Sequence, residues 1–228
     1  MRKPGKSQAG KRKFKIFIVE DHPLMRESLA RLFNLESDLE VCGYAGTAHE
    51  ALRKLPGLKP DIVIVDITLP DGNGLDLIKD MKRRSIQARA LVLSMHDESL
   101  YAERALRAGA KGYIMKHEVS EEVLKAIHRI LKGEIYLSEK MGARMLHKIA
   151  GSKSVKDVLS TETLSDRELQ VFQLIGQGRG TREIAGELCV SVKTVETYRA
   201  HIKLKMNLKN AHELTQHAVH WVESNHLN

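Results

Sequence analysis

The sequence predicts an α/β fold, a doubly wound parallel sheet, followed by a smaller domain built only from helices. Strand and helix patterns alternate about five times between residues 14 and 131, which is typical of a parallel sheet covered on both faces. The central strand, Ile62 to Val65, is an unbroken β-branched run, as expected of a strand buried on both faces. After residue 160 only helical patterns follow. At 228 residues the chain is long enough for about two domains.

The five strands and helices of the first domain are predicted from apolar runs and turn formers. The strands are Phe14 to Val19, Val41 to Ala45, Ile62 to Val65, Ala90 to Leu93 and Gly112 to Met115. The first helix begins at Pro23, and the other four cover Ala48 to Leu55, about Leu75 to Arg84, about Ser99 to Ala108, and Glu121 to Leu131. A flavodoxin-like strand order, 2-1-3-4-5, would make the first and third strands neighbours.

The strand ends carry the chemistry. The first strand delivers Glu20 and Asp21, the third Asp66, the fourth Ser94 and the fifth Lys116, all to the carboxyl edge where such sheets bind ligands. Three carboxylates repel one another unless a cation lies among them, and oxygen ligands of this kind suit Mg²⁺. An isolated aspartate at a strand end more often caps the next helix, but this combination is suited to receiving a phosphoryl group, with Asp66 as the nucleophile.

The second domain begins after a segment rich in Gly, Ser and Lys, residues 133 to 159, which we interpret as a linker with one candidate helix around Glu139 to Ala150. A capping box at Ser165 and Glu168 starts a helix that runs to Ile175. Three more helices are predicted, capped by Thr181 and Ser191 and opened by Asn210. Two of them are joined by so short a turn that they predict a helix-turn-helix.

The third of these helices has two distinct sides at 100° per residue. Its apolar stripe is Val195, Tyr198, Ile202 and Met206. The opposite side combines short side chains with positive ends, which suits close approach to DNA and its phosphates. It consists of Lys193, Thr197 and Ala200, flanked by Glu196 and Lys203. Leu204 falls on the same side, which suggests that the C-terminal end of the helix leaves the groove.

Charge and cysteine content give weaker constraints. Residues 1 to 13 carry six basic residues and no acid, residues 14 to 131 carry 17 basic and 18 acidic, and residues 132 to 228 carry 14 and 11. This fits a near-neutral regulatory module joined to an anion-binding one; the basic arm itself is assigned no role. Cys42 and Cys189 have no CxxC spacing, so neither zinc nor a disulfide framework is indicated. With no membrane-length apolar run and no signal-peptide core, we expect a cytoplasmic protein without membrane contact.

Residues 14 to 131 resemble the receiver domain of bacterial two-component response regulators. The matching residues are Glu20, Asp21, Asp66, the LPDGNG loop, Ser94 and the run GYIMK that ends in Lys116. The resemblance implies that Asp66 is the phosphoacceptor, that Glu20, Asp21, Asp66 and the Thr68 carbonyl hold Mg²⁺, and that Ser94 and Lys116 contact the phosphoryl group. It also implies that Tyr113 is the switch aromatic that turns inward; otherwise Tyr113 would be a half-exposed sheet tyrosine. Met95 stands where many receivers have a smaller residue.

The segments TLSDRELQVFQLI, TREIAGEL and SVKTVETYRAHIKLKM resemble the LuxR-type domain of the NarL/FixJ regulators. The resemblance implies that the third helix enters the major groove, with Glu196, Thr197 and Ala200 facing base edges and with Lys193, Thr194, Tyr198, Arg199 and Lys203 mainly at the backbone. Many relatives have a basic residue at the positions of Glu196 and Ala200. The fourth helix, with Leu214, Ala218, Trp221 and Val222, resembles a dimerisation element and can also close the small core.

The sequence thus predicts a receiver at 14–132, a linker at 133–159 and a LuxR-type helix-turn-helix domain at 160–225. We expect a phosphorylation-dependent transcription regulator, not an enzyme, with at most slow self-dephosphorylation. A sensor histidine kinase or a small-molecule phosphodonor would phosphorylate Asp66, which would shift the receiver and free or dimerise the second domain for double-stranded promoter DNA, bound by a homodimer. The unphosphorylated receiver is expected to pack against the recognition helix or its dimer surface.

Four alternatives fit the residues less well. A haloacid-dehalogenase-like phosphatase needs a second Asp two positions after the nucleophile, where Thr68 stands. A flavin-binding domain needs a hydroxyl-rich loop after the first strand, where Glu20 and Asp21 would repel a phosphate. A receiver that no longer takes phosphate is disfavoured because every required residue is present. An ATP-driven activator would need a Walker-type loop, which the sequence lacks.

Overall fold

The structure, a computed structural model, describes residues 12–118, 121–149 and 161–226. In its first domain five parallel strands form one sheet: β1 (Phe14–Val19), β2 (Leu39–Ala45), β3 (Ile62–Val65), β6 (Arg89–Ser94) and β7 (Gly112–Met115). Their order is β2-β1-β3-β6-β7, which confirms the predicted 2-1-3-4-5 arrangement. Val19 pairs with Val65, and Val65 pairs with Val92, so the strand ends that carry the acidic residues lie side by side.

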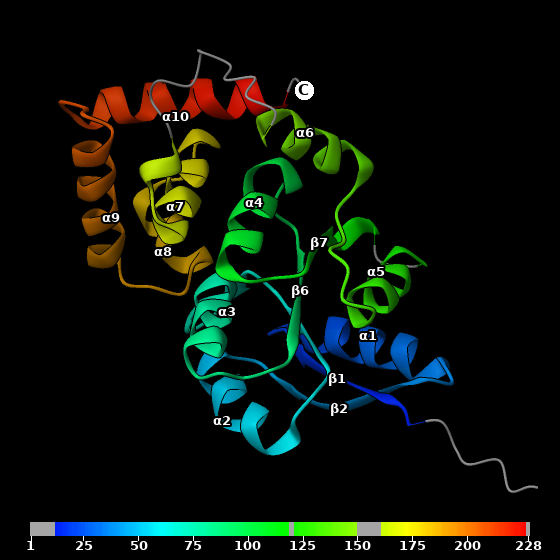
Figure 1. Ribbon diagram of the computed structural model, residues 1–228. Coiled ribbons are helices and arrows are strands. Elements are labelled where there is room, and N and C mark those ends of the chain that lie inside the picture. Colours follow the sequence, from blue (N-terminus) through cyan, green and yellow to red (C-terminus); the bar gives the residue numbers. More distant parts are fainter. Residues whose placement is uncertain (1–11, 119–120, 150–160, 227–228) are drawn as a thin grey trace, which may run out of the picture.

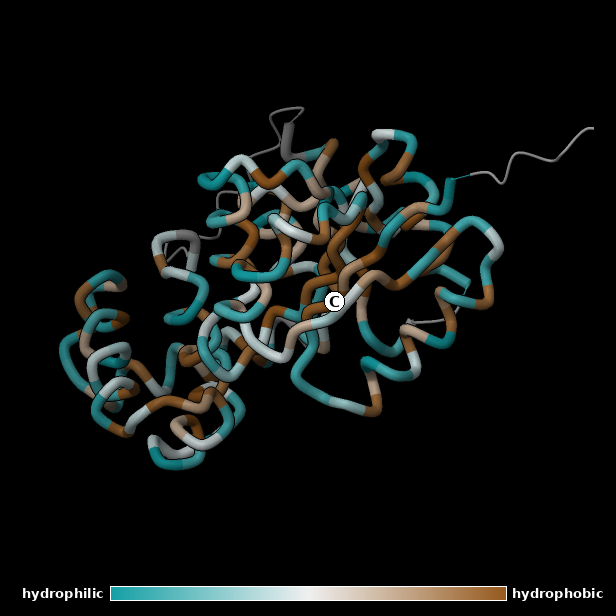
Figure 2. Tube along the Cα trace, turned by 90° about the horizontal axis from the view of Figure 1, so that it is seen from below, coloured by the Kyte–Doolittle hydropathy of each residue, from teal (hydrophilic) through white to brown (hydrophobic). Residues whose placement is uncertain are grey.

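Helices cover both faces of this sheet (Figure 1). They are α1 (Pro23–Leu35), α2 (Ala48–Leu58), α3 (Gly74–Arg83), α4 (Glu98–Ala108) and α5 (Glu121–Leu131). Alternation along β1 separates two cores: Ile16 and Ile18 pack with residues of α1 and α5, whereas Phe17 and Val19 pack with residues of α2, α3 and α4. The apolar strands run through the centre of this domain in Figure 2. Of the described helices, none is long and apolar enough to cross a membrane.

Three details differ from the prediction. Strand β2 begins at Leu39, two residues early, because Leu39 is buried and pairs with Phe14. Helix α2 continues through Pro56 in its last turn to Leu58, and Lys59, whose φ of 46° is left-handed, caps its end. The loop rich in turn formers also contains a small antiparallel hairpin, β4 (Thr68–Leu69) with β5 (Gly72–Asn73).

The chain after α5 remains on the first domain. Tyr136 bridges to the edge strand β7 at Gly112, and α6 (Glu139–Ile149) packs against α4. Ser138 anchors this helix, since its backbone N–H donates to Glu98 Oε1 over 3.0 Å. The described part of the predicted linker is therefore docked, while the predicted last residue of its helix, Ala150, lies outside the described residues.

The second domain consists of η2 (Thr161–Thr163), α7 (Asp166–Gly176), α8 (Thr181–Glu187), α9 (Val192–Lys205) and α10 (Ala211–His226). The predicted capping box at Ser165 and Glu168 is present, but α8 is capped through Gly180, whose N–H donates to Glu183, and not by Thr181. Helices α7 and α10 approach so closely that a Cβ on Gly176 would lie 2.3 Å from the Ala218 carbonyl oxygen. The fourth helix, α10, therefore closes the small core, which is one of the two roles predicted for it; the other, dimerisation, stays a prediction.

Candidate functional site

A buried cluster of charges lies at the carboxyl edge of the sheet. Lys116 Nζ lies 2.8 Å from Asp66 Oδ2 and 2.6 Å from Glu20 Oε2, and all three side chains are almost fully buried. Asp66 follows β3, and its backbone N–H donates to Val19 at the end of β1 over 2.9 Å. Parallel pairing of the two strands thus brings Asp66 and Glu20 to one ammonium group. One positive charge faces two carboxylates here, so the cluster can accept a further cation.

The remaining predicted metal ligands lie beside this cluster. Asp21 Oδ1 is buried and accepts no hydrogen bond from the part of the chain that the structure describes, although His22 Nδ1 lies 2.8 Å away. His22 Nδ1 also lies 2.8 Å from Glu20 Oε1. The Thr68 N–H donates to Asp66 Oδ1 over 3.3 Å, so Thr68 lies beside Asp66, while the role of its carbonyl as a metal ligand stays a prediction. A carboxylate oxygen that lacks a donor and has acidic neighbours fits a hard divalent cation such as Mg²⁺.

The protonation of the cluster follows from burial and charge. Burial raises the pKa of Asp66 to about 6, against the lowering effect of Lys116. Burial alone would lower the pKa of Lys116, but Asp66 and Glu20 outweigh it and raise that pKa. The hydrogen bond to Glu20 and the charge of Asp21 raise the pKa of His22. A lysine that stays charged beside a carboxylate that is ionised at neutral pH can bind and orient a phosphoryl donor.

The loop after β3 fixes the position of Asp66. Gly74 begins α3 so close to β3 that an added Cβ would lie 1.9 Å from the Asp66 carbonyl oxygen, which explains the glycine at this position. Its N–H donates to Ile67 over 2.8 Å. Asp71 at the tip of the loop accepts hydrogen bonds from Ala48 and His49, both 2.8 Å long, and so caps α2. The loop is thereby tied to the start of two helices.

The two predicted switch residues both contact His96. Tyr113 is buried, and its hydroxyl donates to the His96 carbonyl oxygen over 2.7 Å, so the alternative of a half-exposed tyrosine is wrong. Ser94 is also buried, and its Oγ accepts the His96 N–H over 3.2 Å. Met95, which lies between Ser94 and His96 in the chain, is 70% exposed, so its side chain points toward solvent.

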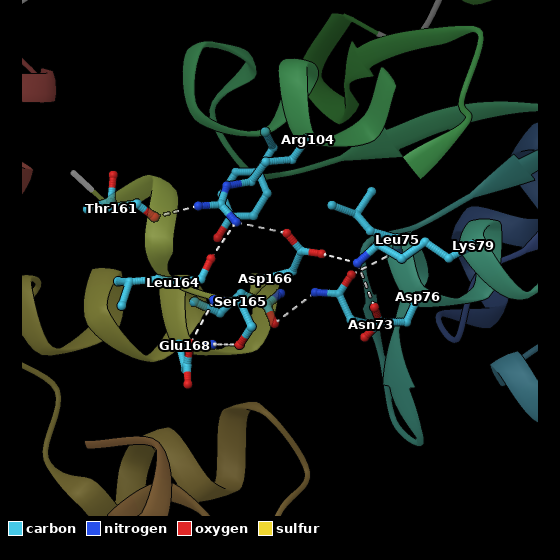
Figure 3. A network of polar contacts seen from close by, with 12 residues as sticks. Asn73, Leu75, Asp76, Lys79, Arg104, Thr161, Leu164, Ser165, Asp166 and Glu168 are labelled. Atoms are coloured by element: carbon cyan, nitrogen blue, oxygen red, sulfur yellow. Dashed lines mark hydrogen bonds and ion pairs between the residues drawn. The ribbon is translucent and has the colours of Figure 1, made fainter. Parts of the chain in front are cut away.

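The first turn of α7 docks on the receiver through ion pairs (Figure 3). Asp166 pairs with Lys79 of α3 at 2.8 Å and with Arg104 of α4 at 3.0 Å. Arg104 also donates to the carbonyl oxygens of Leu164 over 2.8 Å and Thr161 over 2.6 Å. One arginine of the first domain therefore holds three acceptors of the second.

A second set of contacts runs along the same helix. Gln170 of α7 is buried and contacts Asn73 at 3.3 Å and His96 at 3.3 Å. Arg167 donates to the Leu69 carbonyl oxygen over 3.3 Å and to Gln170 over 3.0 Å. This polar interface adjoins a buried apolar cluster that extends from one sheet face into the second domain. Helix α7 is thus an internal element shared by both domains.

The predicted DNA-facing side of α9 remains open. Lys193, Glu196, Thr197 and Ala200 are exposed, and in Figure 1 α9 lies on the side of the second domain away from the sheet. Leu204 is 81% exposed. The residues assigned to the DNA backbone are distributed differently: Thr194, Tyr198, Arg199 and Lys203 are half-buried. Tyr198 lines a cleft of about 390 Å³ between the domains, together with Lys79 and Arg104.

The receiver was expected to pack against the recognition helix or its dimer surface. The first alternative is wrong for the base-facing side chains, which are exposed, and the second stays a prediction. The receiver contacts α7 through Asp166 and Gln170, and Tyr198 of α9 lines the cleft between the domains. The interface residues Asp166 and Gln170 were missed by sequence reasoning, because polar residues on an amphipathic helix are usually solvated. His96, in the loop after β6, was also missed. All five residues from Asp166 to Gln170 are buried, and all but Leu169 are polar or charged; no periodicity could reveal such a run.

Comparisons with known proteins agree with this architecture. Residues 16–128 match the family described as "Response regulator receiver domain", and residues 162–218 match "Bacterial regulatory proteins, luxR family". The chain is 36% identical over 209 residues to the "Oxygen regulatory protein NreC" of Staphylococcus haemolyticus, covering 90% of this chain and 96% of that protein. Its counterpart in Staphylococcus aureus strain JH9 is 37% identical over 210 residues, with the same coverage.

Solved structures show the same similarity. A LuxR-family two-component response regulator from Aurantimonas sp. SI85-9A1 is 33% identical, has a TM-score of 0.56, and is covered over 99% of its length by 60% of this chain. RcsB from Salmonella enterica serovar Typhimurium, solved bound to the rprA promoter with the phosphomimetic BeF3⁻, is 23% identical with a TM-score of 0.60 over 91% of this chain and 98% of that one. At that identity the second similarity supports the fold alone.

Proposed function

Because this chain belongs to the two-component response regulators that join a receiver to a LuxR-type DNA-binding domain, we propose that it controls transcription through phosphorylation of Asp66. The observation that carries the proposal is the buried contact of Lys116 with Asp66 and Glu20 at the carboxyl edge of the sheet. A lysine held there neutralises phosphoryl oxygens while the carboxylate attacks.

The proposed reaction is an in-line phosphoryl transfer. An Asp66 carboxylate oxygen forms a bond to phosphorus as the bond from phosphorus to the donor breaks, which yields an acyl phosphate and releases the donor group. The donor is a phosphohistidine of a sensor kinase or a small acyl phosphate. Lys116 holds the phosphoryl oxygens, and Ser94 supplies a hydroxyl to them. Glu20, Asp21, Asp66 and the Thr68 carbonyl would hold Mg²⁺, which neutralises developing charge on the phosphoryl group.

For the second domain we propose that α9 enters the major groove of promoter DNA. The open side with Glu196, Thr197 and Ala200 supports base contacts, and the cationic residues Lys193, Arg199 and Lys203 support phosphate contacts. Short side chains at 197 and 200 allow close approach. A homodimer on DNA, with Trp221 and Val222 of α10 at or near its contact, remains part of this proposal.

Regulation is proposed to act through the docked α7. Because the base-facing residues are open, the receiver restrains the orientation of the second domain and does not cover those residues. Phosphorylation would shift an equilibrium between docked and released forms toward release. The released domain could then pair with a second copy and align both recognition helices on DNA.

The test of the chemistry is direct labelling. Incubated with acetyl phosphate and Mg²⁺, the protein should gain one phosphoryl group by intact-mass measurement, and Asp66→Asn should gain none because the nucleophile is lost while the shape is nearly kept. Asp71→Asn is the matched control, since Asp71 lies in the same loop but caps α2. Equal labelling of Asp66→Asn and the wild-type protein would contradict the proposal.

A further inference from the structure

His96 connects the phosphoryl site to the second domain through single hydrogen bonds. It lies two residues beyond the end of β6. Its backbone N–H donates to Ser94 Oγ over 3.2 Å, and its carbonyl oxygen accepts the Tyr113 hydroxyl over 2.7 Å. Its ring Nε2 lies 3.0 Å from Thr68 Oγ1 and 3.3 Å from Gln170 Nε2. Every described polar contact of this residue therefore leads to the Asp66 site, to a switch residue or to α7.

The ring nitrogen Nε2 lies within hydrogen-bond distance of one group in each domain. The Gln170 amide nitrogen can only donate, so ring Nε2 is the acceptor of that contact, and the Thr68 hydroxyl competes for the same lone pair. The ring also packs on Tyr101, with centroids 4.6 Å apart, which fixes its plane.

We propose that His96 is a positioning residue that transmits occupancy of the Asp66 site to the docking of α7, through Thr68 and Ser94 on one side and Gln170 on the other. The inference rests on the proposed function, because it requires a phosphoryl group at Asp66. When Ser94 Oγ turns to that group, it takes the His96 backbone with it. A hydrogen bond is lost beyond about 3.5 Å, so a ring displacement of about 1 Å breaks the 3.3 Å contact with Gln170.

Loss of that contact would weaken docking at its most buried point. Gln170 is almost fully buried, and an amide that loses a partner inside an interface destabilises that interface. By reciprocity, docking of α7 should weaken phosphoryl-group binding by the same factor. The contact thus sets the direction of regulation: phosphate favours release, and docking disfavours phosphate.

The experiment measures docking with and without the phosphoryl group in full-length protein. Energy transfer between dyes on Cys189, which is exposed, and on a cysteine introduced at Arg53 in a Cys42→Ser background reports the docked fraction. Acetyl phosphate with Mg²⁺ supplies the phosphoryl group, and intact mass gives the labelled fraction. In the wild-type protein the docking constant should fall by about 5-fold to 150-fold on labelling.

Two variants remove the contact from opposite sides. His96→Phe keeps the packing on Tyr101 but has no acceptor, and Gln170→Met removes the amide from outside the phosphoryl site. Both should dock less tightly, and labelling should then change their docking constant less than about 2-fold instead of the wild-type factor. Lys79→Met is the matched control: it loses the ion pair with Asp166, so docking weakens equally in both states and the ratio stays at its wild-type value.

The ratio of the docking constants without and with the phosphoryl group separates coupling between the two sites from a simple loss of contact. If His96→Phe and Gln170→Met keep the wild-type ratio, or if labelled wild-type protein shows no change in docking, the proposed role of His96 is refuted. Should His96→Phe fail to label, Gln170→Met decides. Absence of labelling in the wild-type protein would instead contradict the proposed function itself.

Discussion

Asp166→Asn tests how strongly the first turn of α7 holds the two domains together. The carboxylate is only 8% exposed and pairs with Lys79, which is 40% exposed, and with Arg104, which is 18% exposed. Removing one partner of a fully buried pair costs about 3 to 5 kcal/mol, whereas an exposed pair contributes about 0 to 1. The pair with Lys79 is exposed enough to contribute little, and Arg104 keeps two carbonyl acceptors when Asp166 is replaced. We therefore expect Asp166→Asn to weaken docking by about 2 kcal/mol.

At about 1.4 kcal/mol for each factor of ten, that loss weakens docking by about 30-fold. The assay is energy transfer between dyes on Cys189 and on a cysteine at Arg53, in the unphosphorylated full-length protein. Asp76→Asn is the matched control, because Asp76 pairs with the same Lys79 within α3 but is 58% exposed; it should change docking by less than about 3-fold. Equal effects of the two substitutions would show that the Asp166 contact does not hold the domains together.

Three further predictions concern DNA binding, the loop beside Asp66 and the pH dependence of stability. Lys203→Ala should weaken binding to all DNA sequences and lower the salt slope by about one unit, whereas Thr197→Ala should alter sequence preference in a selection from random DNA; identical effects would mean that α9 is oriented otherwise. Gly74→Ala should destabilise the receiver by about 1 to 3 kcal/mol in urea unfolding and slow labelling, while Gly72→Ala, which meets nothing within 4 Å, should do neither; matching behaviour of the two would contradict the close approach. The third prediction concerns Glu168. Burial acts to raise the pKa of its carboxyl, but Lys205 at 2.6 Å and the cap at Ser165 outweigh burial, so that pKa is lowered in the fold. The ionised carboxylate therefore stabilises the fold at any pH above the unfolded pKa. The difference in unfolding free energy between wild type and Glu168→Gln should be present at pH 7 and vanish as the pH falls well below about 4. A difference that persists at that low pH would refute the stabilising role of the Glu168 carboxylate.

The local architecture could be predicted because each element has its own signal. Apolar runs predicted the strands, and their alternation with helices predicted a doubly wound parallel sheet; the strand order was taken from the flavodoxin-like arrangement and is the one observed. The capping box at Ser165 predicted the start of α7 correctly. The ends of β2 and α2 were missed, since pairing with Phe14 and packing of the last turn outweigh the local signals of Leu39 and Pro56.

The relative placement of the two domains could not be predicted. Asp166 and Gln170 are polar residues of an amphipathic helix, and only the docked receiver makes them buried. His96 gave no signal either, because its partners Thr68 and Gln170 are 28 and 74 residues away in the chain. Contacts of this kind depend on which surfaces meet, and a single sequence contains no periodicity for that.

The most direct test of the central claim compares DNA affinity of the full-length protein with and without phosphorylation. DNA enriched from a random pool is titrated with wild-type protein and Asp66→Asn, each before and after incubation with acetyl phosphate and Mg²⁺, at concentrations that span dimerisation. We predict that phosphorylation tightens binding by the wild-type protein by about 5-fold to 150-fold and leaves Asp66→Asn unchanged. Equal affinity of phosphorylated and unphosphorylated wild-type protein across that range would contradict the account.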